Sequence, residues 1–367
     1  MDLQPPHLAG VLAIDAGNSK TDVALVAADG TLLGTARGGG FAPHLLGPEA
    51  AVAGLAPLVA AAAAQAGLPT EGLLGEGLLS GGESGVAEGG VAAAAAESRS
   101  LGRPLVSHVH ACLANADLPV EEQALADALL ARHWGASVAV ANDTFGLLRA
   151  GTDTPLGVAV VCGAGINCAG LLPDGRTARF PALGQLTGDW GGGGGLAIEA
   201  MWHATRAEDG RGEPTALAPA IAGHFGLPSA VAVAETVHLG EIGSERLHEI
   251  VPLIFACAEA GDPAALTLID RQAAEIVALA RVALGRLDRL DAATPLVLGG
   301  GVLATGHPLL LDNLYARLRT AAPLAEPRIV TAPPVLGAAL LGLDRLGTGA
   351  DPQRRLRAAY GSVGMAA

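Results

Sequence analysis

Short apolar runs that end in glycine or another turn-forming residue recur along the chain and predict β-strands. The expected strands span residues 11–14, 23–26, 31–37, 106–114, 137–141, 157–161, 168–172, 294–298 and 328–331. Alanine-rich or amphipathic stretches between them predict helices over residues 48–67, 120–134, 196–207, 307–320 and 334–346, and a run of helices over 213–285. Strands and helices that alternate in this way are typical of an α/β protein.

The first predicted hairpin carries a carboxylate at its tip. An apolar strand leads into Asp15, and the turn after it is built from residues that adopt unusual backbone angles or bond their own backbone. Such a tip suits a nucleotide, because its amides, hydroxyls and ammonium group can face phosphate while Asp15 orients a hydrated Mg²⁺. The residues that would face phosphate are Gly17, Asn18, Ser19, Lys20 and Thr21. An ordinary exposed hairpin explains this stretch equally well, so the choice depends on whether a second phosphate-binding turn occurs later in the chain.

A second glycine turn in the later half of the chain supports the nucleotide interpretation. The apolar strand 157–161 turns through residues 162–167, which include Gly163, Gly165 and Asn167, and returns over residues 168–172. Strand, glycine turn and strand thus occur twice. The repetition indicates a duplicated architecture, with two lobes that each offer a phosphate hairpin.

Two aspartates are candidates for chemistry. Asp143 follows Asn142 directly after a buried-type strand, and the carboxyl end of such a strand is where α/β proteins usually bind ligands. Asp189 precedes five consecutive glycines, residues 191–195, whose backbone could lie against a ligand. A simple helix cap is the alternative for Asp189. We favour function, because a glycine loop is entropically costly for capping alone.

Further glycines and histidines mark possible ligand contacts. Gly299, Gly300 and Gly301 join a strand to a helix, where a flat ring or ribose could approach bare backbone, and Gly337 could pack close to a nucleotide. The loop 38–44, which contains His44, is expected to be flexible and to lie where a ligand could meet the sheet, or to be a plain crossover. His108 and His110 share one face of a strand. Without a nearby third ligand, structural histidines are the better interpretation.

Composition excludes several other classes of protein. The chain has 367 residues, which predicts about two domains, and its formal charge of −14 argues against a nucleic-acid partner. The four cysteines form no CxxC pair, so neither a disulfide framework nor a zinc ribbon is expected. The first ten residues lack the basic region of a signal peptide, and a cytoplasmic location is expected. The uncharged stretches 50–70 and 154–173 predict a half-buried helix and a strand–turn–strand unit, and no membrane partner.

The order of the four glycine-containing elements, residues 15–21, 162–167, 299–301 and 337–341, resembles the actin-like ATPase (ribonuclease H-like) fold. Within it, the chain is similar to the BadF/BadG/BcrA/BcrD ATPase family, and most to its N-acetylglucosamine kinase branch. The combination of Asn142-Asp143, Gly-Ala-Gly-Ile-Asn and Gly-Asp-Trp-Gly carries this resemblance, which covers nearly the whole chain apart from about residues 70–104.

The resemblance implies two lobes with mixed sheets flanked by helices and an ATP cleft between them. Residues 1–150, completed by a C-terminal helix at about 335–367, would form one lobe, and residues 151–334 the other. Asp15 would hold Mg²⁺ and Asp143 would be the catalytic base that takes the proton of a sugar hydroxyl. The second turn would bind phosphate, Asn142, Asn167, Asp189 and His44 would contact the sugar, and residues 299–301 would cradle adenosine. A homodimer is expected by analogy only.

The sequence departs from the family pattern in three places. The first turn contains Asp-Ala-Gly-Asn-Ser where the family has Asp-Gly-Gly-Gly-Thr, and Trp190 replaces the usual glutamate. Ala42-Pro43-His44 stands where N-acetylglucosamine kinases carry an Asn-His-Trp-like loop. These departures leave the ATP machinery in place but bear on the identity of the sugar.

The residues leave four functions to compare. An ATP-dependent kinase of a small sugar, such as N-acetylglucosamine or glucosamine, accounts for most of the motifs. An ATPase that activates a dehydratase would need cysteines that bridge an iron–sulfur cluster, and Cys162 and Cys168 are poorly placed for that. A non-catalytic sugar sensor would bind without turnover. A pantothenate kinase shares the Asp-x-Gly-Asn-Ser opening but fewer of the later motifs.

Overall fold

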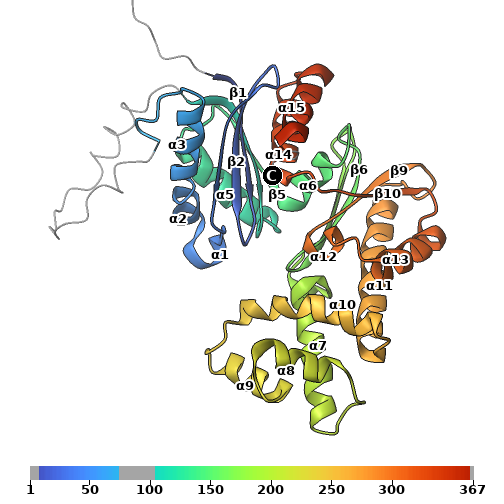
Figure 1. The fold of residues 1–367 in the computed structure, drawn as a ribbon. Helices are drawn as coiled ribbons and strands as arrows, with labels where there is room; N and C mark the ends of the chain where they lie inside the picture. Colours follow the sequence, from blue (N-terminus) through green and yellow to red (C-terminus); the bar gives the residue numbers. More distant parts are fainter. Residues whose placement is uncertain (1–7, 74–103, 364–367) are drawn as a thin grey trace, which may run out of the picture. The chain divides into compact units, whose positions relative to one another are not determined.

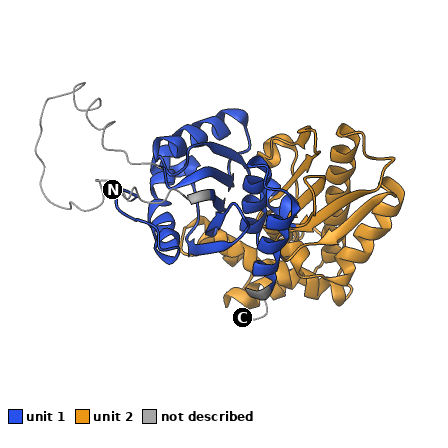
Figure 2. Cartoon of the chain, turned by 90° about the horizontal axis from the view of Figure 1, so that it is seen from above, with its two compact units in different colours: residues 1–150, 332–367 blue, residues 151–331 orange. Residues whose placement is uncertain are grey.

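The computed structural model describes residues 8–73 and 104–363, so the segment 70–104, which the family resemblance does not cover, lies almost wholly outside the described residues. The chain divides into two compact units, coloured in Figure 2. Unit 1 comprises residues 1–150 and 332–367, and unit 2 comprises residues 151–331. Each unit is built around one mixed sheet with helices on its faces, which is the predicted α/β class.

The sheet of unit 1 has five strands in the order β3-β2-β1-β4-β5 (Figure 1). Strands β1 to β3 are antiparallel, and β4 and β5 continue the sheet in parallel with β1. These strands are β1 (Leu8–Ala16), β2 (Thr21–Ala27), β3 (Leu32–Gly38), β4 (Val106–Leu113) and β5 (Val138–Asn142). The short turns keep the first three strands adjacent, whereas the parallel strands require crossovers through helices.

Side-chain alternation divides this sheet into two faces. Leu12 and Ile14 of β1 pack in one hydrophobic cluster, while Val11 and Ala13 pack in another with helix α14. Helices α2, α3 and α5 contribute to the first cluster, and α14 and α15 to the second. The helices of unit 1 are α1 (Pro43–Leu46), α2 (Pro48–Ala53), α3 (Ala56–Gln65), α5 (Pro119–Ala131), α6 (Asp143–Ala150), α14 (Pro334–Arg345) and α15 (Ala350–Val363).

The sheet of unit 2 repeats this plan in the order β10-β9-β6-β7-β8. Its strands are β6 (Gly157–Cys162), β7 (Ile166–Leu171), β8 (Thr177–Arg179), β9 (Thr294–Gly299) and β10 (Ala325–Ile329). Its helices are α7 (Gly192–Glu208), α8 (Leu217–Phe225), α9 (Ala230–His238), α10 (Val251–Glu259), α11 (Pro263–Arg286), α12 (Gly301–Ala304) and α13 (Pro308–Ala321), with 3₁₀ turns η2 (Gly184–Thr187) and η3 (Ser244–Ile250). One large cluster joins β6 and β9 to helices α7 to α13.

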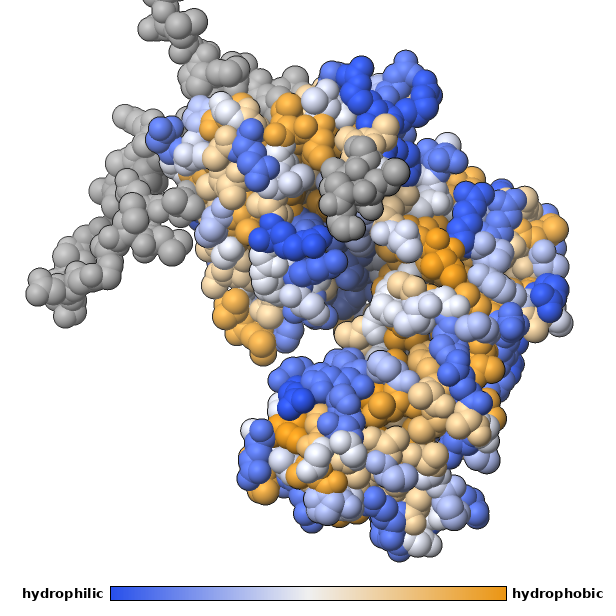
Figure 3. Space-filling model, viewed as in Figure 1, coloured by the Kyte–Doolittle hydropathy of each residue, from blue (hydrophilic) through white to orange (hydrophobic). Residues whose placement is uncertain are grey.

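Several elements differ from the pattern-based prediction. The helix expected over residues 48–67 is two helices, because Pro57 lies in the first turn of α3, where its missing N–H costs nothing. The expected flexible loop before it is wrong in part, since Pro43 and His44 belong to the short helix α1. The sequence pattern does not separate α15 from the helix before it. The surface of α15 is strongly hydrophilic (Figure 3), and among its described residues only Leu356 is fully buried, so few apolar residues mark this helix in the sequence.

By length and apolar composition, residues 48–65 could cross a membrane, and two bent helix pairs, α8 with α9 and residues 244–259 with α11, pass the same test together. In the structure, Val52, Ala56, Val59 and Ala62 of the first stretch are fully buried in the core of unit 1. Packing against the sheet therefore accounts for the apolar side of this stretch.

A buried arginine connects α6 to the C-terminal helices of unit 1. Arg149 is fully buried, and its Nε and Nη2 donate to the two carboxylate oxygens of Asp344 at 2.7 and 3.2 Å. Its Nη2 also donates to Gln353 Oε1 at 2.7 Å, and Gln353 donates to Asp344 in turn. Because one cation bonds residues of both α14 and α15, these helices depend on α6 for their position.

Close backbone packing at Gly300 holds the second glycine turn of unit 2. Gly300 has φ +90° and ψ 158°, and a Cβ placed on it would lie 2.4 Å from the carbonyl carbon and oxygen of Cys162. The adjacent Gly301 has open space around its Cβ position. Only glycine fits at position 300, since both the dihedral angle and the contact exclude a side chain.

We predict that Arg149→Met lowers the free energy of unfolding by about 3–5 kcal/mol, because it leaves the Asp344 carboxylate without its buried partner. Arg176→Ala is the control, since Arg176 pairs with Asp174 and Asp288 at the exposed surface and should change stability by less than about 0.5 kcal/mol. Urea unfolding of both variants measures the difference. Equal losses would contradict the assigned role of Arg149.

We also predict that Gly300→Ala costs at least about 2 kcal/mol of stability, because alanine must enter a conformation that is open only to glycine. Gly301→Ala should be neutral or stabilising by up to about 1 kcal/mol, since its backbone is helical and its surroundings are open. Thermal and urea unfolding of this neighbouring pair provide the comparison. A destabilised Gly301→Ala variant with an unaffected Gly300→Ala variant would refute the packing described above.

Candidate functional site

A row of polar side chains crosses one face of the unit 1 sheet. In the strand register, Asp22 of β2 lies opposite Asp15 of β1, Arg37 of β3 lies opposite Asp22, and Cys112 of β4 lies beside Asp15 on its other side. Alternation places this row on the face that carries Ala13 and packs against α14. Asp15 and Asp22 are both buried, with 7% and 6% of their surface exposed.

Asp22 has a cationic partner, whereas two carboxylates near it do not. Arg37 donates from Nε and Nη2 to the two oxygens of Asp22 at 2.6 and 3.0 Å. Among the described residues, neither Asp15 nor Asp143 forms an ion pair. Burial, followed by the charges of Asp143 and Asp22, raises the pKa of Asp15 to about 8, and loss of solvent raises the pKa of Asp143 to about 6. At neutral pH and without a cation, Asp15 is therefore mostly protonated and Asp143 mostly ionised, and no cationic side chain pairs with either carboxyl group among the described residues.

The junction between β5 and α6 positions Asp143. β5 ends at Asn142, and α6 begins at Asp143, so the carboxyl group lies at the first turn of a helix. Asn142 is buried, its Oδ1 accepts from the N–H of Thr144 at 3.0 Å, and its Nδ2 donates to Asp117 Oδ1 at 2.8 Å. Asn142 therefore holds the junction, because both ends of its amide are bonded within unit 1, and its contact with substrate stays a prediction.

The tip of the first hairpin exposes Asn18, Ser19 and Lys20. The turn is closed by a hydrogen bond from the Gly17 N–H to the Lys20 carbonyl at 2.9 Å, and Asn18 Oδ1 accepts from Asn115 Nδ2 at 2.9 Å. Three consecutive polar side chains thus stand at the end of the strand that carries Asp15.

Two features near this tip differ from the expectation. Thr21 is almost fully buried and lies opposite Ala16, so alternation places its hydroxyl on the face away from Asp15 and Asp22. The loop after β3 is fixed on the tip, since the Phe41 N–H donates to the Gly17 carbonyl at 2.9 Å. A Cβ on Gly40 would meet the Asn18 carbonyl oxygen at 2.1 Å. The expected flexibility of this loop is therefore wrong for its first part.

The donor set of unit 1 fits a magnesium ion. Carboxylate oxygens are the ligands that Mg²⁺ prefers, and a divalent cation would compensate the unpaired charges of Asp15 and Asp143. Among the described residues, no group of three His, Cys, Asp or Glu side chains forms a ready-made metal cage. A cation held here would keep several of its waters, as Mg²⁺ commonly does when it binds together with phosphate.

In unit 2, the run of glycines packs against the second glycine turn. The N–H groups of Gly193 and Gly194 donate to the carbonyls of Gly163 and Ala164 at 2.7 and 2.8 Å. A Cβ on Gly192, which has φ +70°, would lie 2.3 Å from the Gly165 carbonyl oxygen. The expectation that this backbone lies bare against a ligand is therefore corrected for residues 192–194, which hold the turn in place.

His248 is a residue of this region that the sequence patterns do not single out. A Cβ on Gly193 would lie 2.9 Å from His248 Cδ2, so the missing side chain makes room for the imidazole. The ring nitrogen Nδ1 lies 2.9 Å from the carbonyl oxygen of Glu245, in the same 3₁₀ turn. No local signal identifies His248, because it is brought to the turn by the packing of η3 on α7.

The remaining candidates of unit 2 lie around the same turn. Asp189 does not cap α7, since that helix begins at Gly192 without a side-chain cap, and its carboxylate accepts from the Thr187 hydroxyl. The Oδ1 of Asn167 accepts from the Cys168 N–H at 2.7 Å. Trp190 is buried, stacks under Arg271 at 4.0 Å and donates to Glu199 at 3.2 Å.

The two remaining predicted residues, Gly337 and His44, lie in unit 1. A Cβ on Gly337 would lie 1.7 Å from the carbonyl oxygen of Gly146, so this glycine allows α14 to pack against α6 inside unit 1. That contact is sufficient to explain the absent side chain, and the closeness of Gly337 to a nucleotide stays a prediction. His44 is exposed on α1.

His108 and His110 form a pair inside unit 1, with 3.4 Å between His108 Nε2 and His110 Nδ1. Burial lowers their pKa values to about 4 and about 3, which keeps both imidazoles neutral near neutral pH. Their burial agrees with the interpretation as structural histidines, which rests on the absence of a third ligand nearby among the described residues.

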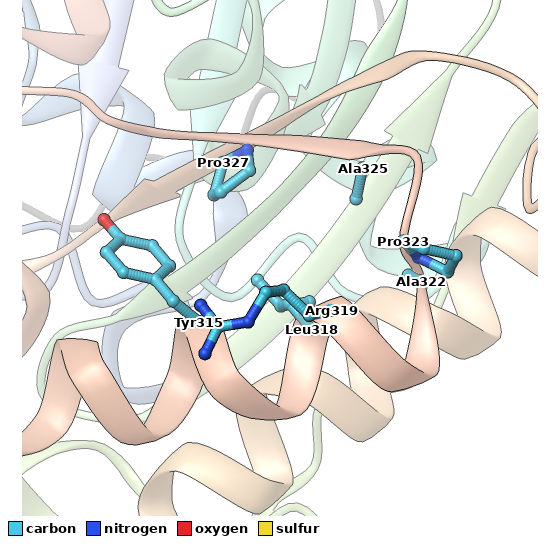
Figure 4. Close-up of a pocket in the computed structure, with 7 residues that line it drawn as sticks. All are labelled: Tyr315, Leu318, Arg319, Ala322, Pro323, Ala325 and Pro327. Carbon is cyan, nitrogen blue, oxygen red and sulfur yellow. The ribbon is translucent and has the colours of Figure 1, made fainter.

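A cavity of about 280 Å³ lies elsewhere in unit 2, between α13 and the strand β10 (Figure 4). Its lining is mostly apolar and consists of Tyr315, Leu318, Arg319, Ala322, Pro323, Ala325 and Pro327. No residue predicted to bind nucleotide or sugar lines this cavity, so it is separate from the polar row and the glycine turn.

Comparison with known proteins places this geometry in a family. The chain is 28% identical over 230 residues to the N-acetyl-D-glucosamine kinase of Dictyostelium discoideum, which covers 59% of the chain and 71% of that protein. It is 23% identical over 231 residues to the N-acetylmuramic acid/N-acetylglucosamine kinase of Clostridium acetobutylicum, over 62% of the chain and 74% of that protein.

The fold matches solved structures over almost the whole chain. A Chromobacterium violaceum protein described as a candidate N-acetylglucosamine kinase aligns with a TM-score of 0.66 and 22% identity, over 92% of this chain and 99% of that one. The ROK hexokinase of Thermus thermophilus aligns with a TM-score of 0.53 and 16% identity, over 92% and 99%. The actin-like sugar-kinase fold predicted from the motifs is confirmed. The model of the BadF/BadG/BcrA/BcrD ATPase family matches residues 12–342, and the chain belongs to that family.

Proposed function

We propose that this protein is an ATP-dependent kinase that phosphorylates a hydroxyl group of an amino sugar, such as N-acetylglucosamine or glucosamine. The observation that carries the proposal is a pair of uncompensated carboxyl groups, the buried Asp15 and the half-buried Asp143, beside an exposed polar hairpin tip. The names of the two curated relatives support the choice of an amino sugar, although their identities of 28% and 23% leave the particular sugar to experiment.

In this proposal, Asp143 is the catalytic base. A base with a pKa of about 6 is largely ionised at neutral pH, yet basic enough to accept the proton of a sugar hydroxyl as its oxygen attacks phosphorus. Asn142 accepts from the Thr144 N–H in the first turn of α6, which fixes the backbone around Asp143. The proton passes from the sugar oxygen to an Asp143 oxygen while a bond forms between that sugar oxygen and the γ-phosphorus of ATP. The bond from the γ-phosphorus to its bridging oxygen breaks, and ADP leaves.

Asp15 would hold Mg²⁺ through water, and the bound cation would neutralise charge on the transferring phosphoryl group. Ser19 and Lys20 at the exposed tip, with Gly17 and Asn18, would bind phosphate oxygens. In unit 2, the turn residues Gly163 and Gly165 would bind phosphate. Gly301, with open space around it, would face adenosine beside Gly299. Gly300 packs against the backbone of Cys162 and Gly163 and so holds the second glycine turn.

The choice of sugar would depend on three residues that this proposal retains as contacts, Asp189, Asn167 and His44. Trp190 stands where an acid is usual in the family, and its stacking on Arg271 leaves no carboxylate at that position. A substrate that needs fewer acidic contacts would suit this arrangement.

The dehydratase-activator alternative loses support from the cysteines. All four, Cys112, Cys162, Cys168 and Cys257, are free and buried. A cluster shared between subunits requires thiolates at a surface, and burial raises the pKa of each of these thiols.

The test is release of ADP from Mg-ATP across a panel of N-acetylglucosamine, glucosamine, N-acetylmannosamine and glucose. We predict sugar-dependent turnover and a loss of about 10²–10⁴ in kcat for Asp143→Asn, because the base is removed while the shape is kept. The matched control is Asp174→Asn, an exposed aspartate of unit 2, which should retain full activity.

No turnover with any sugar would contradict the kinase proposal. Turnover that persists in Asp143→Asn would contradict the assignment of the base, and binding of a sugar without turnover in the wild type would favour a sensor.

A further inference from the structure

The hydroxyl group of Tyr360 is buried and has no hydrogen-bond partner in the part of the chain that the structure describes. Tyr360 lies near the end of α15 and packs against the cluster that includes Ala13 and Ala24. These two alanines are the same-face neighbours of Asp15 and Asp22 along β1 and β2. A buried hydroxyl without a partner costs free energy, so its retention at this place needs an explanation.

The path of α15 brings Tyr360 to the acidic end of the sheet. The helix starts beside the turn after β2, where Pro352 lies against Gly30 and Arg355 pairs with Asp29. Eight residues of helix advance about 12 Å, against about 17 Å for the five strand steps from Ala27 to Asp22, so the helix covers most of the distance from that turn to Asp22. The helix therefore runs back along β2 toward the polar row.

The electrostatics agree with this placement. Burial, and then the charges of Asp22 and Asp15, raises the pKa of the Tyr360 hydroxyl, so it stays protonated and can act as a hydrogen-bond donor. Both oxygens of Asp22 already accept from Arg37. Asp15 has no such partner, so the Tyr360 hydroxyl, which lies within electrostatic reach of Asp15, is a donor without an acceptor near a carboxyl group without a cation.

We propose that Tyr360 is a further positioning residue of the unit 1 site, whose hydroxyl donates a hydrogen bond to the water shell of the divalent cation that Asp15 orients. This inference rests on the proposed function, because the cation is taken from it. It assigns a role to the C-terminal helix, which the motifs near the N-terminus do not include. A residue that serves packing alone would retain its phenyl ring and would not need the hydroxyl.

The test compares Tyr360→Phe with Tyr315→Phe, since these are the two tyrosines of the chain. Tyr315 lies on α13 in unit 2, outside the polar row. Mn²⁺ is used as the probe, and its dissociation constant is measured by calorimetry in the presence of ADP. We expect Tyr360→Phe to weaken Mn²⁺ binding about three- to tenfold, the loss of one hydrogen bond, and Tyr315→Phe to leave it unchanged.

Thermal unfolding separates this role from a structural one. Without metal, Tyr360→Phe should unfold at the same temperature as the wild type or slightly higher, because it removes an unpartnered hydroxyl. The increase in unfolding temperature on addition of Mn²⁺ and ADP should be smaller than in the wild type. A loss of stability that is equal with and without metal would overturn the proposal.

The variant Asp15→Asn distinguishes failure of the role assigned to Tyr360 from failure of the metal site in the proposed function. Unchanged Mn²⁺ binding in Tyr360→Phe, together with weakened binding in Asp15→Asn, would refute the role of Tyr360 and leave the kinase proposal standing. A wild-type protein that binds no Mn²⁺ with ADP would refute both the role of Tyr360 and the metal site on which it depends.

Discussion

The structure of unit 1 depends on how negative charge is held on one face of its sheet. Three strands bring Arg37, Asp22 and Asp15 side by side, and the single guanidinium compensates the carboxylate next to it. Asp143, at the start of α6, adds to the charge that acts on Asp15. Removing an unpaired carboxylate from water is costly. Two such carboxyl groups in one place therefore favour the binding of a cation or of a proton there.

The surrounding helices make this arrangement possible. Arg149 bonds residues of α14 and α15 to α6, and Gly337 lets α14 approach the backbone of α6. The same helices cover the apolar part of the face that carries the acids. In unit 2, glycines have a comparable purpose, since Gly192 and Gly300 allow the backbone to pack on the turn around Gly163. In both units, close packing around a site has determined where glycine is required.

Strand positions and the carboxylates at their ends could be predicted from the sequence, because alternation and strand-end turns are local signals. Asp143 at the end of β5 and the hairpin tip after Asp15 follow from such signals. The roles of Asn142, Gly337 and the glycine run could not be predicted, because each depends on a contact with a segment distant in the chain. The face on which the Thr21 side chain lies could not be predicted either, because it depends on how β1 and β2 are paired. Tyr360 and His248 lie on elements whose sequences carry no motif.

The charge of the two acids can be measured by an NMR titration of the aspartate carboxyl carbons, assigned with Asp15→Asn and Asp143→Asn. Without metal, we expect Asp143 to titrate near pH 6 and Asp15 near pH 8. Addition of Mg²⁺ with ADP should move the midpoint of Asp15 to lower pH, because a bound cation favours the ionised carboxylate. Two carboxyl groups that titrate near pH 4 and do not respond to Mg²⁺ would show that unit 1 holds no uncompensated charge for a cation.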